Sequence, residues 1–201
     1  MLDLILFGAL PYVSVILFLL VSIRRYRRDP FTFSSLSSQF LETKELFWGS
    51  VPFHVGILTL FFGHLVGFLV PRSMTLWNAV PLRLFVLEAT GLAAAFLTLF
   101  GLANLVVRRV RNARLRQATT VTDVVVYVLL AFQILTGLWV ALALRWGSAW
   151  YPQVVVPYLW SLVKLQPDVQ RMVELKLPAQ VHVVGAFVFF AGAAGTVLRE
   201  S

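Results

Sequence analysis

Five apolar runs, each of 22 to 24 residues, constrain this 201-residue chain more than any other feature. The runs cover residues 2–23, 47–70, 84–107, 121–144 and 177–198. A helix needs about 20 apolar residues to cross the hydrocarbon core of a bilayer, because each residue advances it by about 1.5 Å. We therefore predict an all-α membrane protein, a single domain over residues 1–201 that forms a five-transmembrane-helix bundle.

The composition supports a membrane protein, since 59% of the residues are hydrophobic and only 13% are charged. The chain has no cysteine, which excludes disulfides, cysteine-ligated zinc and iron–sulfur clusters on this chain. The first apolar run lacks a basic leading region and a small-residue cleavage site, and it is too long for the core of a signal peptide. We expect this run to be retained as a helix.

The net charge of +8 would suit nucleic acid, but the basic residues lie in short connections between apolar runs. Connections 24–44 and 108–116 together hold ten Lys and Arg residues, whereas the other two connections hold six over longer segments. By the positive-inside rule, the N-terminus is outside and the C-terminus is cytoplasmic. The expected location is the cell (cytoplasmic) membrane, multi-pass, with membrane lipid and not nucleic acid as a partner.

The connection between the fourth and fifth runs is too long for a turn and mixes apolar residues with spaced charges. Its aromatic residues suit the headgroup depth of a bilayer; they are Trp146, Trp150, Tyr151, Tyr158 and Trp160. We predict an outer amphipathic helix at the membrane interface here. This helix would either roof a pocket for a lipid-like substrate or serve as an inert anchor.

All three histidines lie within apolar runs: His54 and His64 in the second run and His182 in the fifth. An ionisable side chain inside a membrane is costly and therefore indicates a functional site. Ten residues separate His54 from His64, which places them about 15 Å apart along one helix. In the predicted orientation, His64 and His182 lie at similar depths near the outer side, and His54 lies nearer the cytoplasm.

Two interpretations of these histidines remain open. Imidazoles on separate helices hold haem iron as axial ligands, so His64 and His182 would bind one haem and His54 would mark a second, inner site. Glycine-rich helix surfaces, as at Gly56, Gly63 and Gly67, let a flat group approach the backbone. Alternatively, the histidines form hydrogen bonds between helices and bind no cofactor.

Arg114 and Arg116 precede the fourth run and are candidates to pair with haem propionates, because a guanidinium matches a carboxylate. The stronger interpretation of most of these loop arginines is that they set the topology or bind lipid headgroups. The Thr119, Thr120 and Asp123 pattern predicts the start of a helix, since Thr and Asp favour the N-cap and the first turn.

Four segments carry a resemblance to a known family. They are FHVGILTLFFGHLVGFLVP, SSLSSQFLETKELFWGS, RLRQATTVTDVVVYVLLAFQILTGL and WSLVKLQPDVQRMVELKLPAQVHVVGAF. Over about residues 1 to 190, the sequence resembles the gamma subunit of respiratory nitrate reductase, a membrane cytochrome b. The histidine pair ten residues apart, followed by glycine and proline, is the most specific part of this resemblance.

The resemblance implies a haem b subunit that oxidises quinol near the outer side. Electrons would pass inward to a cytoplasmic iron–sulfur subunit and a molybdenum-cofactor catalytic subunit. It also implies that His64 and His182 bind the outer haem and that His54 binds the inner haem with a fourth histidine. The role of a lysine near the family's quinol site would fall to Arg83, the nearest basic residue.

The fourth histidine of the family pattern should lie about 18 positions after His182, and Glu200 stands at that position. We therefore expect one haem b, and a second that is weakly held or completed by a partner. Two other functions remain open: a related cytochrome b serving a sulfur-compound or heterodisulfide-type reductase, and a haem-free membrane anchor.

Overall fold

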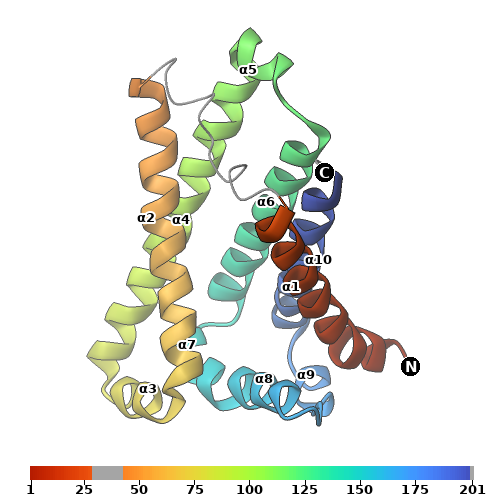
Figure 1. Cartoon of the computed structure of the whole chain (residues 1–201). Helices are drawn as coiled ribbons and strands as arrows, with labels where there is room; N and C mark the ends of the chain where they lie inside the picture. Colours follow the sequence, from red (N-terminus) through yellow and green to blue (C-terminus); the bar gives the residue numbers. More distant parts are fainter. Residues whose placement is uncertain (29–42, 200–201) are drawn as a thin grey trace.

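A computed structural model describes residues 1–28 and 43–199, which form helices joined by short turns, with no β-strand in these two ranges (Figure 1). The long helices are α1 (Leu10–Arg28, preceded by the π-helix η1, Leu4–Ala9), α2 (Thr43–Leu69), α4 (Pro81–Arg111), α6 (Val121–Ala143) and α10 (Leu177–Arg199). The all-α prediction is confirmed. Residues 34–42, the serine-rich part of the segment that carries the family resemblance, and Glu200 lie outside the described residues.

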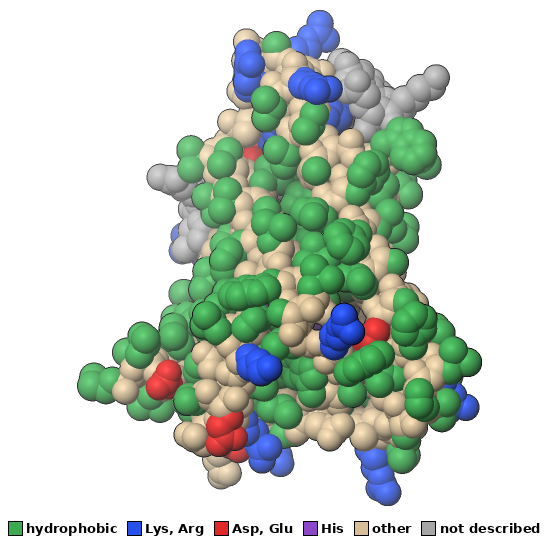
Figure 2. All heavy atoms as spheres, turned by 180° about the vertical axis from the view of Figure 1, so that it is seen from behind, with side chains coloured by type: hydrophobic (Ala, Val, Ile, Leu, Met, Phe, Trp, Pro, Cys, Tyr) green, Lys and Arg blue, Asp and Glu red, His purple; other side chains and the backbone are tan. Residues whose placement is uncertain are grey.

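Four of the five predicted spans are long and apolar enough to cross a membrane: Leu4–Arg24, Leu46–Leu69, Pro81–Arg111 and Val121–Ala143. The fifth falls in α10, whose described apolar stretch, Leu177–Gly192, is shorter. The five-span count and the orientation therefore stay predictions. Hydrophobic side chains cover the middle of the molecule, and basic side chains gather near its two ends (Figure 2).

Helices α2 and α4 run antiparallel and pack closely through glycines. A Cβ on Gly56 would lie 2.6 Å from the Ala94 carbonyl oxygen, and one on Gly101 would lie 2.8 Å from the Gly49 carbonyl oxygen. Real Cβ atoms do not approach backbone atoms so closely, so only glycine permits this helix spacing. The pairing fixes the register between α2 and α4.

Helix α6 joins this pair to the rest of the bundle. Ala95 and Leu102 of α4 and Ile134 and Leu138 of α6 form one buried apolar cluster. On its other side α6 packs against α10, which in turn packs against α1. The Phe18 and Phe190 rings meet edge to face across the α1–α10 contact, with centroids 5.3 Å apart.

One end of the bundle, called here the α8 end, is closed by short elements. Helix α3 (Pro71–Asn78) joins α2 to α4, and α7 (Gly147–Trp150), the π-helix η2 (Tyr151–Val155), α8 (Val156–Val163) and α9 (Gln170–Val173) connect α6 to α10. Helix α8 lies across the ends of the long helices (Figure 1). The predicted outer helix is thus a run of short helices that turns between α8 and α9.

The short elements α7, η2, α8 and α9 are together called the cap. Two tyrosines attach the cap to α1 and to the π-helix η1 that precedes it. The Tyr158 hydroxyl donates to the Phe7 carbonyl at 2.8 Å, and the Tyr12 hydroxyl donates to the Leu162 carbonyl at 3.0 Å. On the α2 side, the Trp160 ring stacks on Phe68 with centroids 5.0 Å apart. The cap therefore links α1 to α2 across the end of the bundle.

The opposite end, called the α5 end, holds α5 (Ala113–Gln117) between α4 and α6. The Thr120 side chain accepts from the Asp123 amide, and the Asp123 carboxylate accepts from the Thr120 amide. This reciprocal capping box begins α6 at Val121. The helix start predicted from Thr120 and Asp123 is confirmed.

Candidate functional site

His54 and His64 lie exposed on α2 and share one hydrogen-bonding arrangement. Nδ1 of His54 lies 2.7 Å from the Ser50 carbonyl oxygen, and Nδ1 of His64 lies 2.8 Å from the Leu60 carbonyl oxygen. Because a carbonyl oxygen only accepts hydrogen bonds, Nδ1 carries the proton in both rings. The lone pair of each neutral imidazole is then on Nε2, the nitrogen left free to bind a metal.

These two imidazoles fit the requirements of haem. The porphyrin supplies four ligands to its iron, so the protein needs to add only axial imidazoles beside an open surface. Next to His64, a Cβ placed on Gly63 would have no atom within 4 Å. The described residues hold no group of three or more His, Asp or Glu side chains that could bind a bare metal ion.

His182 differs, because it contacts a neighbouring helix instead of its own. Its ring lies over Gly137 of α6, with Cε1 3.1 Å from the position of a Cβ there. Nδ1 lies 3.1 Å from the Thr136 hydroxyl, which itself donates to the Phe132 carbonyl at 2.8 Å. The Thr136 oxygen is thus left to accept the Nδ1 proton of His182.

The Gln133 amide nitrogen lies 3.2 Å from Nδ1 and 3.4 Å from Nε2 of His182. An amide nitrogen only donates. With the proton of the ring on Nδ1, Gln133 donates to Nε2. A metal bound at Nε2 would replace this one hydrogen bond and keep the Thr136 contact.

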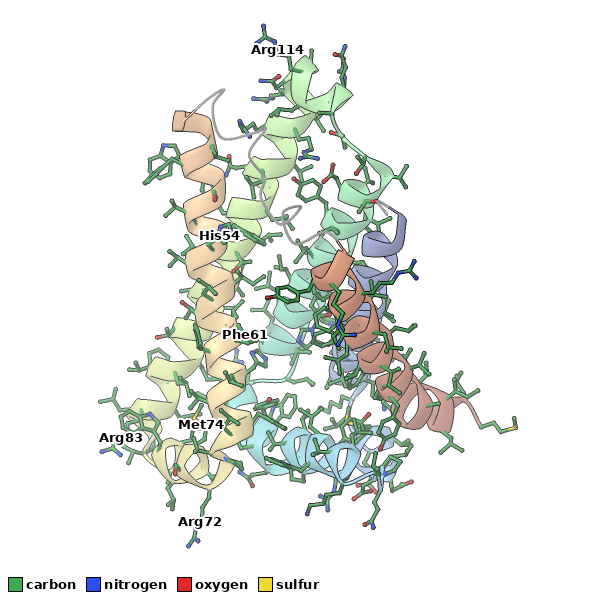
Figure 3. All side chains as sticks on the ribbon, viewed as in Figure 1. His54, Phe61, Arg72, Met74, Arg83 and Arg114 are labelled. Atoms are coloured by element: carbon green, nitrogen blue, oxygen red, sulfur yellow. The ribbon has the colours of Figure 1, made fainter. Side chains whose placement is uncertain are left out.

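His64 and His182 come from different helices, α2 and α10. Helix α2 packs mainly against α4, and α10 packs against α6 and α1. His54 lies on α2 toward the α5 end, and Phe61 lies between it and the α8 end (Figure 3). The hydrogen bonds of His54 stay within α2.

Tyr151, considered from the sequence only as an interfacial aromatic, belongs to the His64 region. Its hydroxyl donates to the His64 carbonyl at 3.2 Å, and its ring meets the His64 ring edge to face at 5.4 Å between centroids. Gly67 makes room for the tyrosine, since a Cβ there would lie 2.8 Å from Tyr151 Cε1. Burial raises the pKa of Tyr151 to about 12, so the hydroxyl remains a donor at physiological pH.

A second polar group at the α8 end was also missed from the sequence. Glu88 of α4 accepts hydrogen bonds from the amide of Ser148 at 2.6 Å and from its hydroxyl at 2.5 Å. The Asn78 amide nitrogen donates to the Ser148 carbonyl at 2.6 Å. Arg83, the quinol-site candidate, is exposed and lies over the Trp77 ring, with its guanidinium carbon 4.7 Å from the ring centroid.

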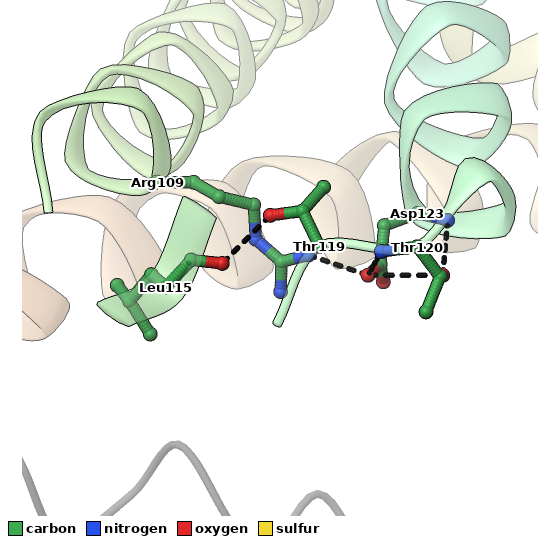
Figure 4. Close-up of polar contacts among 5 residues, drawn as sticks. All are labelled: Arg109, Leu115, Thr119, Thr120 and Asp123. Carbon is green, nitrogen blue, oxygen red and sulfur yellow. Dashed lines mark hydrogen bonds and ion pairs between the residues drawn. The ribbon is translucent and has the colours of Figure 1, made fainter. Parts of the chain in front are cut away.

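At the α5 end, Arg114 and Arg116 are exposed on α5, and Arg114 lies well away from His54 (Figure 3). Arg109 forms an ion pair with Asp123 at 2.6 Å beside the α6 capping box (Figure 4). Arg108 is only 9% exposed, and its Nε and one terminal nitrogen are buried without a hydrogen-bond partner. Arg109 has Asp123 as a carboxylate partner, whereas Arg108 has no such partner among the described residues.

The fold and the histidines define a helical protein with membrane-spanning helices that presents free imidazole nitrogens from α2 and a third imidazole from α10. Residues 3–194 match the family model described as nitrate reductase gamma subunit. The chain is 32% identical over 190 residues to the nitrate reductase gamma chain of Bacillus subtilis, covering 92% of this chain and 85% of the relative.

Two further relatives match at similar levels. The respiratory nitrate reductase 2 gamma chain of Escherichia coli is 36% identical over 138 residues, 68% of this chain and 61% of the relative. The nitrate reductase-like protein NarX of Mycobacterium tuberculosis is 34% identical over 187 residues, 90% of this chain but 28% of the relative. The chain belongs to the nitrate reductase gamma subunit family.

Proposed function

We propose that this chain is the haem b-containing membrane subunit of a respiratory nitrate reductase. It would oxidise quinol near the outer side and pass electrons to cytoplasmic iron–sulfur and molybdenum-cofactor subunits. The observation that carries the proposal is the pair of α2 histidines, each with Nδ1 bonded to its own helix and Nε2 free, in a member of this family. Family membership favours nitrate reductase over a sulfur-compound or heterodisulfide-type reductase as the soluble partner.

His64 and His182 would hold the outer haem, which when bound accepts and gives up single electrons. The Leu60 carbonyl and the Thr136 hydroxyl orient these imidazoles, because each accepts the Nδ1 proton and leaves Nε2 for iron. Tyr151 holds the His64 backbone from the α8 end. These residues act by fixing the direction of the ligand nitrogen.

The location and direction of transport follow from the predicted orientation. The α8 end would face outward and the α5 end, with Arg108 to Arg116, would face the cytoplasm in the cell membrane. Quinol oxidised at the α8 end would release its protons outside while its electrons move inward. Membrane lipid surrounds the exposed apolar faces.

The inner site would rest on His54, with its second ligand weak or supplied by a partner. Arg108 joins Arg114 and Arg116 as a candidate for the haem propionates, because a buried guanidinium with unpaired nitrogens favours an anion. Arg108 meets this requirement better than Arg114 and Arg116, because those two side chains are exposed on α5.

One observation favours a second candidate function, the haem-free anchor. The Gln133 amide reaches the ring of His182, as expected for a histidine that only links α6 to α10. In that case the chain would dock the soluble subunits and carry no electrons.

The reduced-minus-oxidised visible spectrum of the purified complex separates the two functions. We expect a low-spin haem b signal that falls by at least one haem per chain in His64→Ala and in His182→Ala. Thr59→Ala is a matched control, because Thr59 is also exposed on α2 and bonds the carbonyl four residues earlier at 2.7 Å. Its spectrum should stay unchanged.

His54→Ala tests the inner site in the same assay. Absence of haem from the wild-type complex would refute the electron-transfer function and leave the anchor. A full low-spin signal in both the His64 and His182 variants would refute the outer ligand assignment alone. Two haems that both survive His54→Ala would refute the inner site.

A further inference from the structure

Glu88 is an acid well inside a membrane-capable helix, and neither the fold nor the proposed haem sites use it. The four described spans contain two acidic residues: Asp123, at the first turn of α6 and paired with Arg109, and Glu88. Glu88 lies seven residues after the start of α4, and no ion pair between described residues includes it. A carboxylate at such a position is costly and is therefore a functional candidate.

The antiparallel register places Glu88 at the depth of His64. Gly56 of α2 lies opposite Ala94 and Thr98 of α4. His64 lies eight residues after Gly56 on α2. Glu88 lies eight residues before the α4 position midway between Ala94 and Thr98. Because both helices advance by about 1.5 Å per residue, the two side chains lie at similar depths near the α8 end.

The connection from α6 links these two residues directly. Ser148 binds Glu88, and Tyr151, three residues later, binds the backbone of His64. A Cβ on Gly91, one turn from Glu88 along α4, would have no atom within 4 Å. The α4 surface one turn from Glu88 is therefore uncovered by other described residues.

Two oxygen acceptors around Ser148 remain unused. One carboxylate oxygen of Glu88 accepts both hydrogen bonds from Ser148, and the other has no hydrogen-bond partner in the described part of the chain. Asn78 is 8% exposed and donates through its nitrogen to the Ser148 carbonyl, while its oxygen is buried without a partner. The second carboxylate oxygen of half-buried Glu88 and the buried amide oxygen of Asn78 are both acceptors, so together they favour a ligand with hydroxyl donors.

We propose that Glu88 is the proton acceptor for quinol oxidation, with Asn78 and Ser148 completing the polar end of the quinol site. The inference rests on the proposed function and assigns the residue that performs its first proton transfer. The quinol hydroxyl would hydrogen-bond to the free carboxylate oxygen of Glu88. Its O–H bond breaks, a new O–H bond forms on Glu88, and the electron pair stays on the quinolate oxygen.

The quinolate would then give up two electrons, one at a time, and its remaining hydroxyl proton, and so become quinone. The second hydroxyl proton follows once Glu88 has released the first to water at the α8 end. The overall balance is one quinol giving one quinone, two protons and two electrons. Glu88 thus couples oxidation to proton release on one side of the membrane.

A purely structural role for Glu88 would be to fasten the α6–α7 turn to α4. Glu88→Gln separates the two roles, because the amide oxygen of glutamine still accepts from Ser148 but cannot take a proton at neutral pH. Glu174→Gln is the matched control: Glu174 is an exposed acid at the same end, hydrogen-bonded to Gln170.

The experiment uses the whole complex and compares quinol with a reduced viologen, which gives electrons directly to the soluble subunits. We expect Glu88→Gln to lower the quinol-driven kcat about 100-fold, as for loss of a general base, with viologen-driven activity and haem content unchanged. Binding of a hydroxyquinoline N-oxide, a redox-inert quinol analogue, should weaken about 10-fold, because the glutamine amide nitrogen donates where the free carboxylate oxygen of Glu88 accepts. Glu88→Asp should restore part of the rate.

Infrared difference spectra give a readout that does not depend on turnover. Adding quinol should produce the C=O band of a protonated carboxyl in the wild type and in Glu174→Gln, but not in Glu88→Gln. If Glu88→Gln keeps the wild-type kcat with quinol, or keeps the carboxyl C=O band, the proposal for Glu88 is overturned. The proposed function is tested separately, by the haem content and the quinol oxidation of the wild-type complex. If Glu88→Gln does not assemble, an unshifted band in Glu88→Asp overturns it.

Discussion

The Tyr151 hydroxyl donates a hydrogen bond to the backbone carbonyl of His64 at 3.2 Å, and the two rings meet edge to face. The contact joins the η2 turn to α2 at the position of a proposed haem ligand. It also explains Gly67, because any larger residue one turn further along α2 would displace the tyrosine ring. The cap at the α8 end therefore helps to position His64.

Removing this hydrogen bond should weaken the cap without unfolding the bundle. We expect Tyr151→Phe to lower the free energy of unfolding by about 1 kcal/mol, the usual net value of one hydrogen bond. Thermal unfolding of the purified protein in detergent measures the effect. Tyr26→Phe is the control, because Tyr26 is 71% exposed; equal effects of the two changes would contradict a specific role for Tyr151.

Thr136 should act as a positioning residue for His182. Thr136→Val keeps the shape but removes the oxygen that accepts the Nδ1 proton, so we expect haem affinity to fall about 10-fold or more, as for other lost partners of metal-binding histidines. Haem retention during dilution of the purified complex measures this affinity. Thr59→Val serves as the control on α2, and a Thr136→Val complex that keeps haem as well as this control would refute the role.

Replacing a glycine by alanine should destabilise the protein where the glycine lies in the α2–α4 contact, and should not do so where the helix surface is open. Gly101→Ala would force α4 away from the Phe53 backbone, and such overpacking costs about 1–3 kcal/mol of stability. Gly91→Ala meets no atom and should stabilise α4 by up to about 1 kcal/mol, the difference in helix propensity. Thermal unfolding of both variants tests this; destabilisation by Gly91→Ala equal to that by Gly101→Ala would show that the helix spacing is wrong.

The orientation is testable because the natural chain has no cysteine. Arg114→Cys and Lys164→Cys place single thiols at exposed positions of opposite ends. An impermeant maleimide added to intact cells should label residue 164 and not residue 114. The reverse pattern would invert the proposed direction of electron flow, and labelling of both after cell lysis confirms that each thiol is reactive.

Alkaline pH should destabilise the α8 end through its buried tyrosines. Burial raises the pKa of Tyr151 to about 12 and raises that of Tyr158 further, against about 10 in an unfolded chain. A raised folded pKa means that the unfolded state loses its proton first. The contribution is full below pH 10 and is lost as pH rises from 10 toward the folded values.

Unfolding experiments between pH 9 and about 12, with phenolate absorbance followed in parallel, measure this loss. Tyr151→Phe should reduce the slope of stability against pH, because one group with a shifted pKa is removed. If stability falls with pH as steeply in Tyr151→Phe as in the wild type, the Tyr151 hydroxyl is not buried.

The elements of this fold could be predicted from local sequence because their causes are local. The apolar run at 121–144 matches α6 at Val121–Ala143, and the Thr120–Asp123 pair caps it as its side chains predict. The ten-residue spacing of His54 and His64 likewise fixed their separation on one helix, since helical rise is constant. Membership of the family followed from motifs within single helices.

The surroundings of the histidines were decided by packing between helices distant in sequence. Tyr151 contacts a residue 87 positions away, and Glu88 binds a residue 60 positions away. Arg114 and Arg116 were chosen by their position before α6, yet it is Arg108 that α4 buries without a partner. Sequence periodicity determined which residues share a helix, but which helix faces touch depends on close glycine contacts and on the cap at the α8 end, and these exist only in the folded bundle.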